Sequence, residues 1–266
     1  MCSWSLRPED PGSLAATLRT LGIPRVQLAL LPLLEDGATW CDAGRALSGE
    51  GIRIVSGMMQ TVGEDYSTLE SIARTGGVRP DGSWPATLDR ALRTADLAAS
   101  LGLTLVTFHA GFIPHEAGTD RSTMLARLRT LVDHFATRGV NLAFETGQET
   151  AETLTSALDE LDRPSAGVNL DPANMVLYGM GDPVAAAQTL LPRIAQVHVK
   201  DARATPTPGT WGQEVPVGMG DVAWGALLAV LSSTPRALDL VIEREAGSCR
   251  ESDITGAKSL IEREWR

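Results

Sequence analysis

The hydrophobic positions of the chain follow two alternating spacings. Short runs rich in leucine and β-branched residues recur, and longer stretches with a helical apolar pattern separate them. Such runs are typical of buried strands, and their alternation with helices is typical of repeated βα units. Eight strands are predicted, at 2–6, 25–31, 52–57, 103–109, 140–145, 166–171, 194–200 and 238–243.

The stretches between these runs carry apolar stripes on one helical face. Two of them are Leu88, Leu92, Ala95 and Ala99, and Met124, Leu128, Leu131 and Phe135. Stripes at this spacing indicate helices that pack on a core. Asp182 followed by Pro183 predicts a capped helix start, and Asp221 is predicted to cap the helix after "GMG".

Eight βα units in 266 residues predict an α/β fold, a (β/α)₈ TIM barrel that forms one domain over residues 1–266. The glycine pairs Gly179/Gly181 and Gly218/Gly220 complete neither a dinucleotide-binding nor a phosphate-loop motif. The Pro- and Gly-containing stretches at 75–85 and 204–218 are predicted to be long loops within the domain. In this fold, active sites gather at the C-terminal ends of the strands.

Composition narrows the range of partners. The formal net charge of −10 disfavours nucleic acid, and no apolar window approaches the roughly 20 residues that span a bilayer. We expect a cytoplasmic protein with a small-molecule partner, and a homo-oligomer stays open beside a monomer. The three scattered cysteines form no CxxC pair, so neither a disulfide framework nor a structural zinc site is expected.

Ionisable residues close the later predicted strands. "VTFH" ends in His109, "LAFE" in Glu145, "VNLD" in Asp171 and "LVIE" in Glu243, while "VHVKD" supplies His198 and Lys200. A lone acid at a βα turn usually caps the next helix. A barrel, however, brings its strand ends to one face. Glu145, Asp171, His198 and Glu243 are therefore predicted to share one cavity.

Three carboxylates in one cavity repel one another unless a cation neutralises them. Glu145, Asp171, His198 and Glu243 are therefore predicted to bind one divalent metal ion. This oxygen-rich ligand set suits Mn²⁺, Mg²⁺ or Co²⁺, and Zn²⁺ is the further candidate.

Four segments resemble a known family. "FETGQET", "NLDPANMVLYGMGDP", "VHVKDA" and "VIERE" are similar to the strand ends of the sugar phosphate isomerase/epimerase family with the xylose isomerase-like barrel. The family also includes ketose 3-epimerases, inosose dehydratases and apurinic endonucleases. The resemblance implies that Glu145, Asp171, His198 and Glu243 bind the metal, and that Glu145 and Glu243 exchange protons with a substrate carbon through an enediolate.

The chain departs from the family pattern at Asn174, where ketose 3-epimerases carry a substrate-binding histidine. Apurinic endonuclease activity is not expected, because that reaction uses additional histidines and this chain has four in total. Further residues are predicted to contact substrate, namely His109, Gln148, Asn174, Lys200, Arg203 and Trp211. Thr146 and Glu149 also fit a capping box at this turn, and Asp201 is predicted to orient His198 or Lys200.

The sequence therefore predicts a metal-dependent sugar isomerase or epimerase, an enzyme of carbohydrate metabolism. Three alternatives stay open. They are a metal-dependent dehydratase acting on a cyclic keto-polyol, a metal-free Schiff-base aldolase using Lys200, and a non-catalytic sugar-binding barrel.

Overall fold

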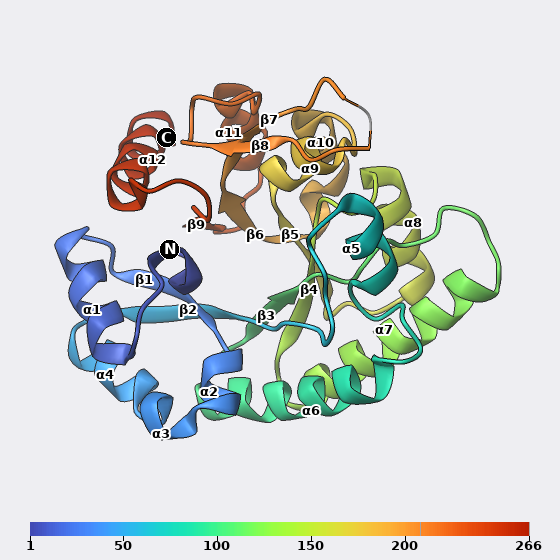
Figure 1. Ribbon diagram of the computed structural model, residues 1–266, viewed down its shortest axis with the longest axis horizontal. Coiled ribbons are helices and arrows are strands. Elements are labelled where there is room, and N and C mark those ends of the chain that lie inside the picture. Colours follow the sequence, from blue (N-terminus) through green and yellow to red (C-terminus); the bar gives the residue numbers. More distant parts are fainter. Residues whose placement is uncertain (208, 266) are drawn as a thin grey trace.

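A nearly closed barrel of parallel strands forms the centre of the molecule. The computed structural model describes residues 1–207 and 209–265. Seven strands form one parallel sheet in the order β1-β2-β3-β4-β5-β6-β9, with helices packed around it (Figure 1). The strands are β1 (Arg25–Ala29), β2 (Arg53–Met58), β3 (Leu105–Phe108), β4 (Asn141–Glu145), β5 (Ala166–Leu170), β6 (Ile194–Val199) and β9 (Asp239–Ile242). The predicted α/β barrel in a single domain is confirmed.

Seven of the eight predicted strands are present, with ends that differ by at most two residues from the prediction. Their runs are almost continuously apolar because side chains point both into the barrel and outward to the helices, so both faces are buried. The barrel interior also contains polar residues, since Gln27, Ser56, Thr107, Asn169 and Gln196 are all fully buried.

The predicted first strand is wrong. Cys2 forms a single parallel bridge with Gln27, and its N–H donates to the carbonyl of Ile242 at 2.8 Å. Met1 and Cys2 thus lie between β1 and β9, where the chain start is drawn in Figure 1. The chain then turns into a 3₁₀ helix, η1 (Ser3–Leu6).

Two serine hydroxyls explain why the strand stops after one residue. Ser3 Oγ accepts the N–H of Ala29 at 2.9 Å, and Ser5 Oγ accepts the N–H of Arg244 at 2.9 Å. These side chains occupy donors at the ends of β1 and β9 that a further strand would otherwise pair. The gap between β1 and β9 is therefore bridged by the backbone of Met1 and Cys2 and by the hydroxyls of Ser3 and Ser5.

The outer layer consists of helices, most of which alternate with the barrel strands along the chain. They are α1 (Pro11–Thr20), α2 (Leu31–Glu35), α3 (Gly37–Trp40), α4 (Ala43–Gly49), α5 (Leu69–Thr75), α6 (Trp84–Ser100), α7 (Thr119–Thr137), α8 (Ala151–Leu161), α9 (Pro172–Tyr178), α10 (Pro183–Leu190), η2 (Leu191–Arg193), α11 (Trp224–Ser232) and α12 (Arg250–Glu264). The part of the chain that the structure describes contains no helix with the length and apolar character needed to cross a membrane.

The predicted helical stripes lie in α6 and α7. All four residues of the α7 stripe are buried, whereas in α6 the fully buried face is Ala91, Ala95 and Ala98. Leu88 and Leu92 are only half-buried. Small residues at the centre of the α6 face let the helix approach its neighbours closely, and the leucines pack at its edge.

One of the two predicted helix caps is present. Asp182 Oδ1 accepts the N–H of Ala185 at 2.8 Å at the start of α10. Asp221 instead accepts the N–H of Ala204 at 2.8 Å, and α11 begins after Ala223 without a side-chain cap. The Asp221 prediction is wrong because this carboxylate fastens the preceding loop.

The predicted loop after β6 contains a small hairpin. β7 (Asp201–Arg203) pairs antiparallel with β8 (Gln213–Val215). Asp201 is 1% exposed and fixes the base of this segment. Its carboxylate accepts hydrogen bonds from the backbone of Ala202, Gly218, Gly220 and Val222 and from Trp224 Nε1. The hairpin is thereby held next to the ends of the barrel strands.

Candidate metal centre

Four strands deliver the four predicted ligands to one place. Glu145 is the last residue of β4, Asp171 follows β5, His198 is the fifth residue of β6, and Glu243 follows β9. All four side chains are at most 4% exposed. Parallel strands of similar register place these positions at the same end of the barrel, which is why residues up to 98 positions apart in the sequence meet.

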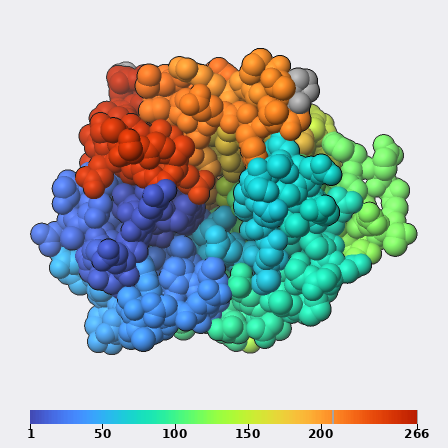
Figure 2. Space-filling view, in the orientation of Figure 1, coloured from blue at the N-terminus to red at the C-terminus, as the bar shows by residue number. Residues whose placement is uncertain are grey.

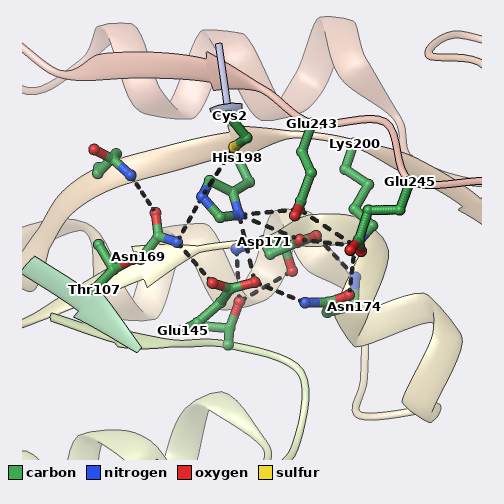
Figure 3. Close-up of polar contacts among 12 residues, drawn as sticks. Cys2, Thr107, Glu145, Asn169, Asp171, Asn174, His198, Lys200, Glu243 and Glu245 are labelled. Carbon is green, nitrogen blue, oxygen red and sulfur yellow. Dashed lines mark hydrogen bonds and ion pairs between the residues drawn. The ribbon is translucent and has the colours of Figure 1, made fainter. Parts of the chain in front are cut away.

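The imidazole of His198 faces three carboxylates. Its Nδ1 lies 3.4 Å from Glu145 Oε1, 3.6 Å from Asp171 Oδ2 and 3.2 Å from Glu243 Oε2 (Figure 3). One potential ligand atom from each of the four residues lies within 4.8 Å of the others. This is the arrangement of donors around a single ion.

Three of these atoms have no hydrogen-bond partner among the described residues. They are His198 Nδ1, Asp171 Oδ2 and Glu243 Oε2, and all three are buried. Buried polar atoms are rarely left without a partner, since each costs about 1–3 kcal/mol. Three oxygen ligands and one imidazole fit a divalent cation, which would satisfy all of these atoms at once.

The other oxygen of each acid is held by the protein. Glu145 Oε2 accepts from Asn169 Nδ2 at 3.1 Å, Asp171 Oδ1 from the N–H of Asn174 at 2.9 Å, and Glu243 Oε1 from Trp4 Nε1 at 2.6 Å. Each carboxylate is therefore oriented by one oxygen and turns the other toward the shared centre. Such outer contacts fix the geometry of metal ligands.

His198 is oriented from its opposite edge. Its Nε2 lies 2.7 Å from Gln27 Oε1, and Gln27 Nε2 donates to Thr107 Oγ1 at 2.8 Å. The Thr107 hydroxyl donates to Met58 Sδ, which leaves its oxygen to accept from the amide. An amide oxygen can only accept, so the short contact to Gln27 favours a proton on His198 Nε2, although Asn169 Nδ2 also lies 3.1 Å from that nitrogen. With a cation bound, Nδ1 would be the ring nitrogen that faces it.

The charges in the centre depend strongly on one another. Burial raises the pKa of Asp171 to about 6. Burial also opposes ionisation of Glu243, but Lys200 and His198 outweigh it and lower its pKa well below the ordinary value. The pKa of His198 is raised well above its usual range, because neighbouring acidic groups outweigh the effect of burial. A cluster that attracts protons in this way also attracts a cation.

A cavity of about 750 Å³ opens next to the centre. Aromatic side chains contribute much of its wall, namely Trp4, Tyr66, Tyr178 and Trp211. Figure 2 shows that the dark blue N-terminal segment, the cyan segment around α5 and the orange-red C-terminal third meet on this face of the molecule. The cavity is large enough for a monosaccharide-sized ligand.

Four of the residues predicted to contact substrate line this cavity. They are His109, Asn174, Lys200 and Trp211. His109 Nε2 lies 3.6 Å from Glu145 Oε1, and Asn174 Nδ2 donates to the same oxygen at 2.9 Å. Gly147, with φ +133°, makes this approach possible, since a Cβ there would lie 2.5 Å from the Cβ of Asn174.

Three predicted contacts lie elsewhere. Gln148 is 3% exposed and lies outside the cavity lining. The exposed Arg203 donates through Nε to the carbonyl of Met219 at 3.0 Å, also outside the lining. The described contacts of Asp201 go to the segment after β7, so it orients neither His198 nor Lys200. Its backbone donors lie in β7 and in the turn after β8, so its charge is satisfied within this loop segment.

The capping box at Thr146 and Glu149 is also wrong. Thr146 Oγ1 bonds the backbone of Asp171 in both directions, and α8 begins later, with Thr150 as its cap. Thr146 thus ties the ends of β4 and β5 together at the centre. Glu149 is buried, and burial raises its pKa to about 8.

Sequence reasoning missed several residues of the centre and the cavity. The role of Trp4 was missed because residues 2–6 were predicted to form a strand. In the observed 3₁₀ helix its indole donates to Glu243. Tyr178 lies at the end of an apolar helix pattern, and Tyr66 lies in a polar stretch without periodicity. Gln27 was detectable in principle, since it is a polar residue inside an otherwise apolar predicted strand.

Comparison with known proteins agrees with this architecture. The family model for xylose isomerase-like TIM barrels matches residues 16–263. The xylose isomerase domain protein of Planctomyces limnophilus is 29% identical, with a TM-score of 0.87 over 93% of this chain and 90% of that chain. No protein with curated function matches the sequence significantly.

Two more distant structures share the fold. The probable 3-DHS dehydratase AsbF from Bacillus anthracis is 17% identical, with a TM-score of 0.74 over 98% of this chain and 97% of that one. An L-ribulose 3-epimerase is 17% identical, with a TM-score of 0.73 over 100% of this chain and 93% of that one. With the family model covering nearly the whole length, the chain belongs to the xylose isomerase-like TIM barrel family.

Proposed function

We propose that this protein is a divalent-metal-dependent isomerase or epimerase of a sugar or sugar derivative. The observation that supports it best is the set of buried atoms without a hydrogen-bond partner on His198, Asp171 and Glu243, beside a cavity of about 750 Å³. The shared fold with an L-ribulose 3-epimerase supports the reaction class. Membership of the family supports an enzyme rather than a binding module.

Glu145, Asp171, His198 and Glu243 would hold the cation, with Mn²⁺, Mg²⁺ or Co²⁺ favoured by the oxygen-rich set. When bound, it would supply Lewis acidity to a substrate carbonyl, which acidifies the neighbouring C–H bond. The partnerless atoms of the centre are a reason to expect this ion independently of the family.

Glu145 and Glu243 are the proposed proton carriers. Glu145 belongs to β4 and Glu243 follows β9, two strands separated by β5 and β6 in the sheet. The two carboxylates therefore approach His198 from different sides, as proton removal and return on opposite faces of one carbon require. The low pKa of Glu243, set by Lys200 and His198 against the effect of burial, keeps it ionised as a base near neutral pH.

Dehydration is the second candidate reaction. Loss of water needs an acid beside the base, and Lys200 Nζ lies 3.3 Å from Glu243 Oε2 inside the cavity. The shared fold with the probable dehydratase AsbF agrees with this alternative. A Schiff base at Lys200 is disfavoured, because the nearby acids raise the pKa of its amine well above the ordinary value despite burial.

Metal binding is tested by elemental analysis of purified protein, with each proposed ligand changed to alanine in turn. We expect about one divalent ion per wild-type chain and a loss in each variant. Undiminished metal in all four variants would exclude the proposed centre. Glu251→Ala, an exposed change on α12, is the matched control.

The reaction is tested by solvent deuterium uptake into ketoses, aldoses and their phosphates. Glu145→Gln and Glu243→Gln preserve shape but remove the base, so hydrogen exchange should fall far more than sugar binding. If no sugar takes up deuterium while inososes or other cyclic ketones lose water, the dehydratase assignment replaces this one. If neither reaction occurs with metal-loaded protein, the enzymatic proposal fails.

A further inference from the structure

The charge balance of the cavity is acidic. Among the described residues that line it, Lys200 is the only lysine or arginine, whereas the acids are Glu64, Glu214, Glu243 and Glu245. A wall of this composition repels a phosphate group, which carries close to two negative charges at neutral pH.

Lys200 is already neutralised by carboxylates. Its Nζ lies 2.9 Å from Glu245 Oε2, 3.3 Å from Glu243 Oε2 and 3.9 Å from Asp171 Oδ2 (Figure 3). The oxygens of Glu243 and Asp171 in these pairs are the same ones that face His198 Nδ1. Because a bound cation would draw on those two oxygens, Glu245 is the acidic partner that would remain for Lys200, beside a longer contact of 3.4 Å to Asn174 Oδ1.

Other basic groups near the cavity are held elsewhere. Arg244 Nη1 pairs with Glu214 at 2.6 Å and its Nε with Asp253 at 2.9 Å. Arg203 contacts the carbonyl of Met219 and lies outside the lining. His109 faces Glu145. The two arginines next to this wall therefore already have acceptors, which leaves Lys200 as the cationic side chain that could reach a phosphate.

We propose that Glu245 is a specificity-determining residue that makes the cavity select unphosphorylated sugars over their phosphate esters. By pairing with Lys200 it occupies the one lysine or arginine side chain of the described lining, and with Glu64 it adds repulsion. The aromatic rings of Trp4, Tyr178 and Trp211 offer apolar faces to the C–H surface of a neutral sugar. This inference rests on the proposed function and deepens it.

The test compares metal-loaded wild type with Glu245→Gln and with Glu251→Gln. The control removes the same formal charge from an exposed position on α12 outside the lining. Dissociation constants are measured by calorimetry for inorganic phosphate, D-fructose and D-fructose 6-phosphate. Inorganic phosphate could also bind the metal ion, which wild type and both variants share, so the difference between wild type and Glu245→Gln reports on Lys200 even when fructose is not the natural substrate.

We expect wild type to bind fructose 6-phosphate no more tightly than fructose. In Glu245→Gln the freed ammonium should tighten phosphate binding about tenfold, and the affinity ratio of the ester to the free sugar should rise by the same factor. The Glu251→Gln ratio should stay at the wild-type value. Preference of wild type for the ester, or an equal ratio and phosphate affinity in Glu245→Gln and wild type, would overturn the inference.

The outcome is separable from that of the proposed reaction. A protein that takes up deuterium into sugars but shows no Glu245 effect keeps its function and loses this specificity mechanism. A protein that shows the Glu245 effect without any proton exchange keeps the selective cavity and loses the isomerase assignment.

Discussion

Replacing Gln27 with leucine removes the contact behind His198 at nearly constant volume. Gln27 is fully buried and makes hydrogen bonds of 2.7 Å to His198 Nε2 and 2.8 Å to Thr107 Oγ1. The change leaves the Nε2 proton of His198 without this acceptor in the barrel interior. We expect Gln27→Leu to weaken metal binding, because the ring loses the contact that fixes its orientation and its tautomer.

The magnitude follows from the contacts that are lost. An orphaned buried donor costs about 1–3 kcal/mol of folding free energy. Loss of an outer hydrogen bond to a metal-bound histidine typically weakens affinity about tenfold to hundredfold, which is about 1.4–2.8 kcal/mol. Gln27→Glu keeps an acceptor facing Nε2 and should retain the metal affinity within about threefold of wild type. This result would identify loss of the hydrogen bond as the cause of weaker metal binding in Gln27→Leu.

Competition between the protein and a chelator for Mn²⁺ gives the dissociation constants, and denaturant melts give the stabilities. With Mg²⁺ bound, ¹⁵N shifts of the His198 ring should show a protonated Nε2 in wild type. Thr94→Val is the control, since it removes a buried hydroxyl in α6 that donates to the carbonyl of Arg90 and does not contact the centre. If folded Gln27→Leu binds Mn²⁺ as tightly as wild type, the reasoning about this contact is refuted.

Chelation should lower the melting temperature, because three clustered carboxylates lose their neutralising ion; an unchanged Tm after confirmed metal loss would contradict the centre. Burial raises the pKa of Glu149 from 4.5 to about 8, so between these pH values the folded state binds more protons than the unfolded state. The free energy of unfolding should therefore fall as pH rises through this range, by at most about 5 kcal/mol. Denaturant melts should show that Glu149→Gln removes this loss, and an identical pH profile would contradict the assignment. Asp201→Asn should cost about 1.5–3 kcal/mol and speed proteolysis of the 201–224 segment without changing metal content; intact protease resistance would show that Asp201 does not fasten it.

The sequence was sufficient for seven of the eight predicted strands and for the cluster of candidate ligands at their ends. An apolar run that ends in an acid, as at Glu145, Asp171 and Glu243, can be recognised from a few neighbouring residues. Because the C-terminal ends of barrel strands meet on one face, these acids were predicted to share one cavity. The N-terminal strand was wrong because Ser3 and Ser5 replace backbone pairing with hydroxyl contacts to Ala29 and Arg244. The spacing of hydrophobic residues does not predict such hydrogen bonds between a side chain and a distant backbone.

Contacts between distant loops were the other limit. Arg203 and Asp201 lie next to the predicted site in the sequence, but their partners are Met219 and the turn around Gly218, beyond the hairpin. Trp4 bonds Glu243 across nearly the whole chain length. Such pairs depend on where loops fold back, which the spacing of hydrophobic residues does not encode.

The closure of the barrel by Met1 and Cys2 also sets an order of events during synthesis. Met1 and Cys2 leave the ribosome well before their partner Ile242 and the candidate ligand Glu243, which follow about 240 residues later, roughly 12–50 s at about 5–20 residues per second. Until then the nascent chain has an open sheet edge at β1 and an incomplete set of ligands. The proposed ion would therefore bind only after Glu243 has emerged, and chaperones that cover exposed strand edges would act before it.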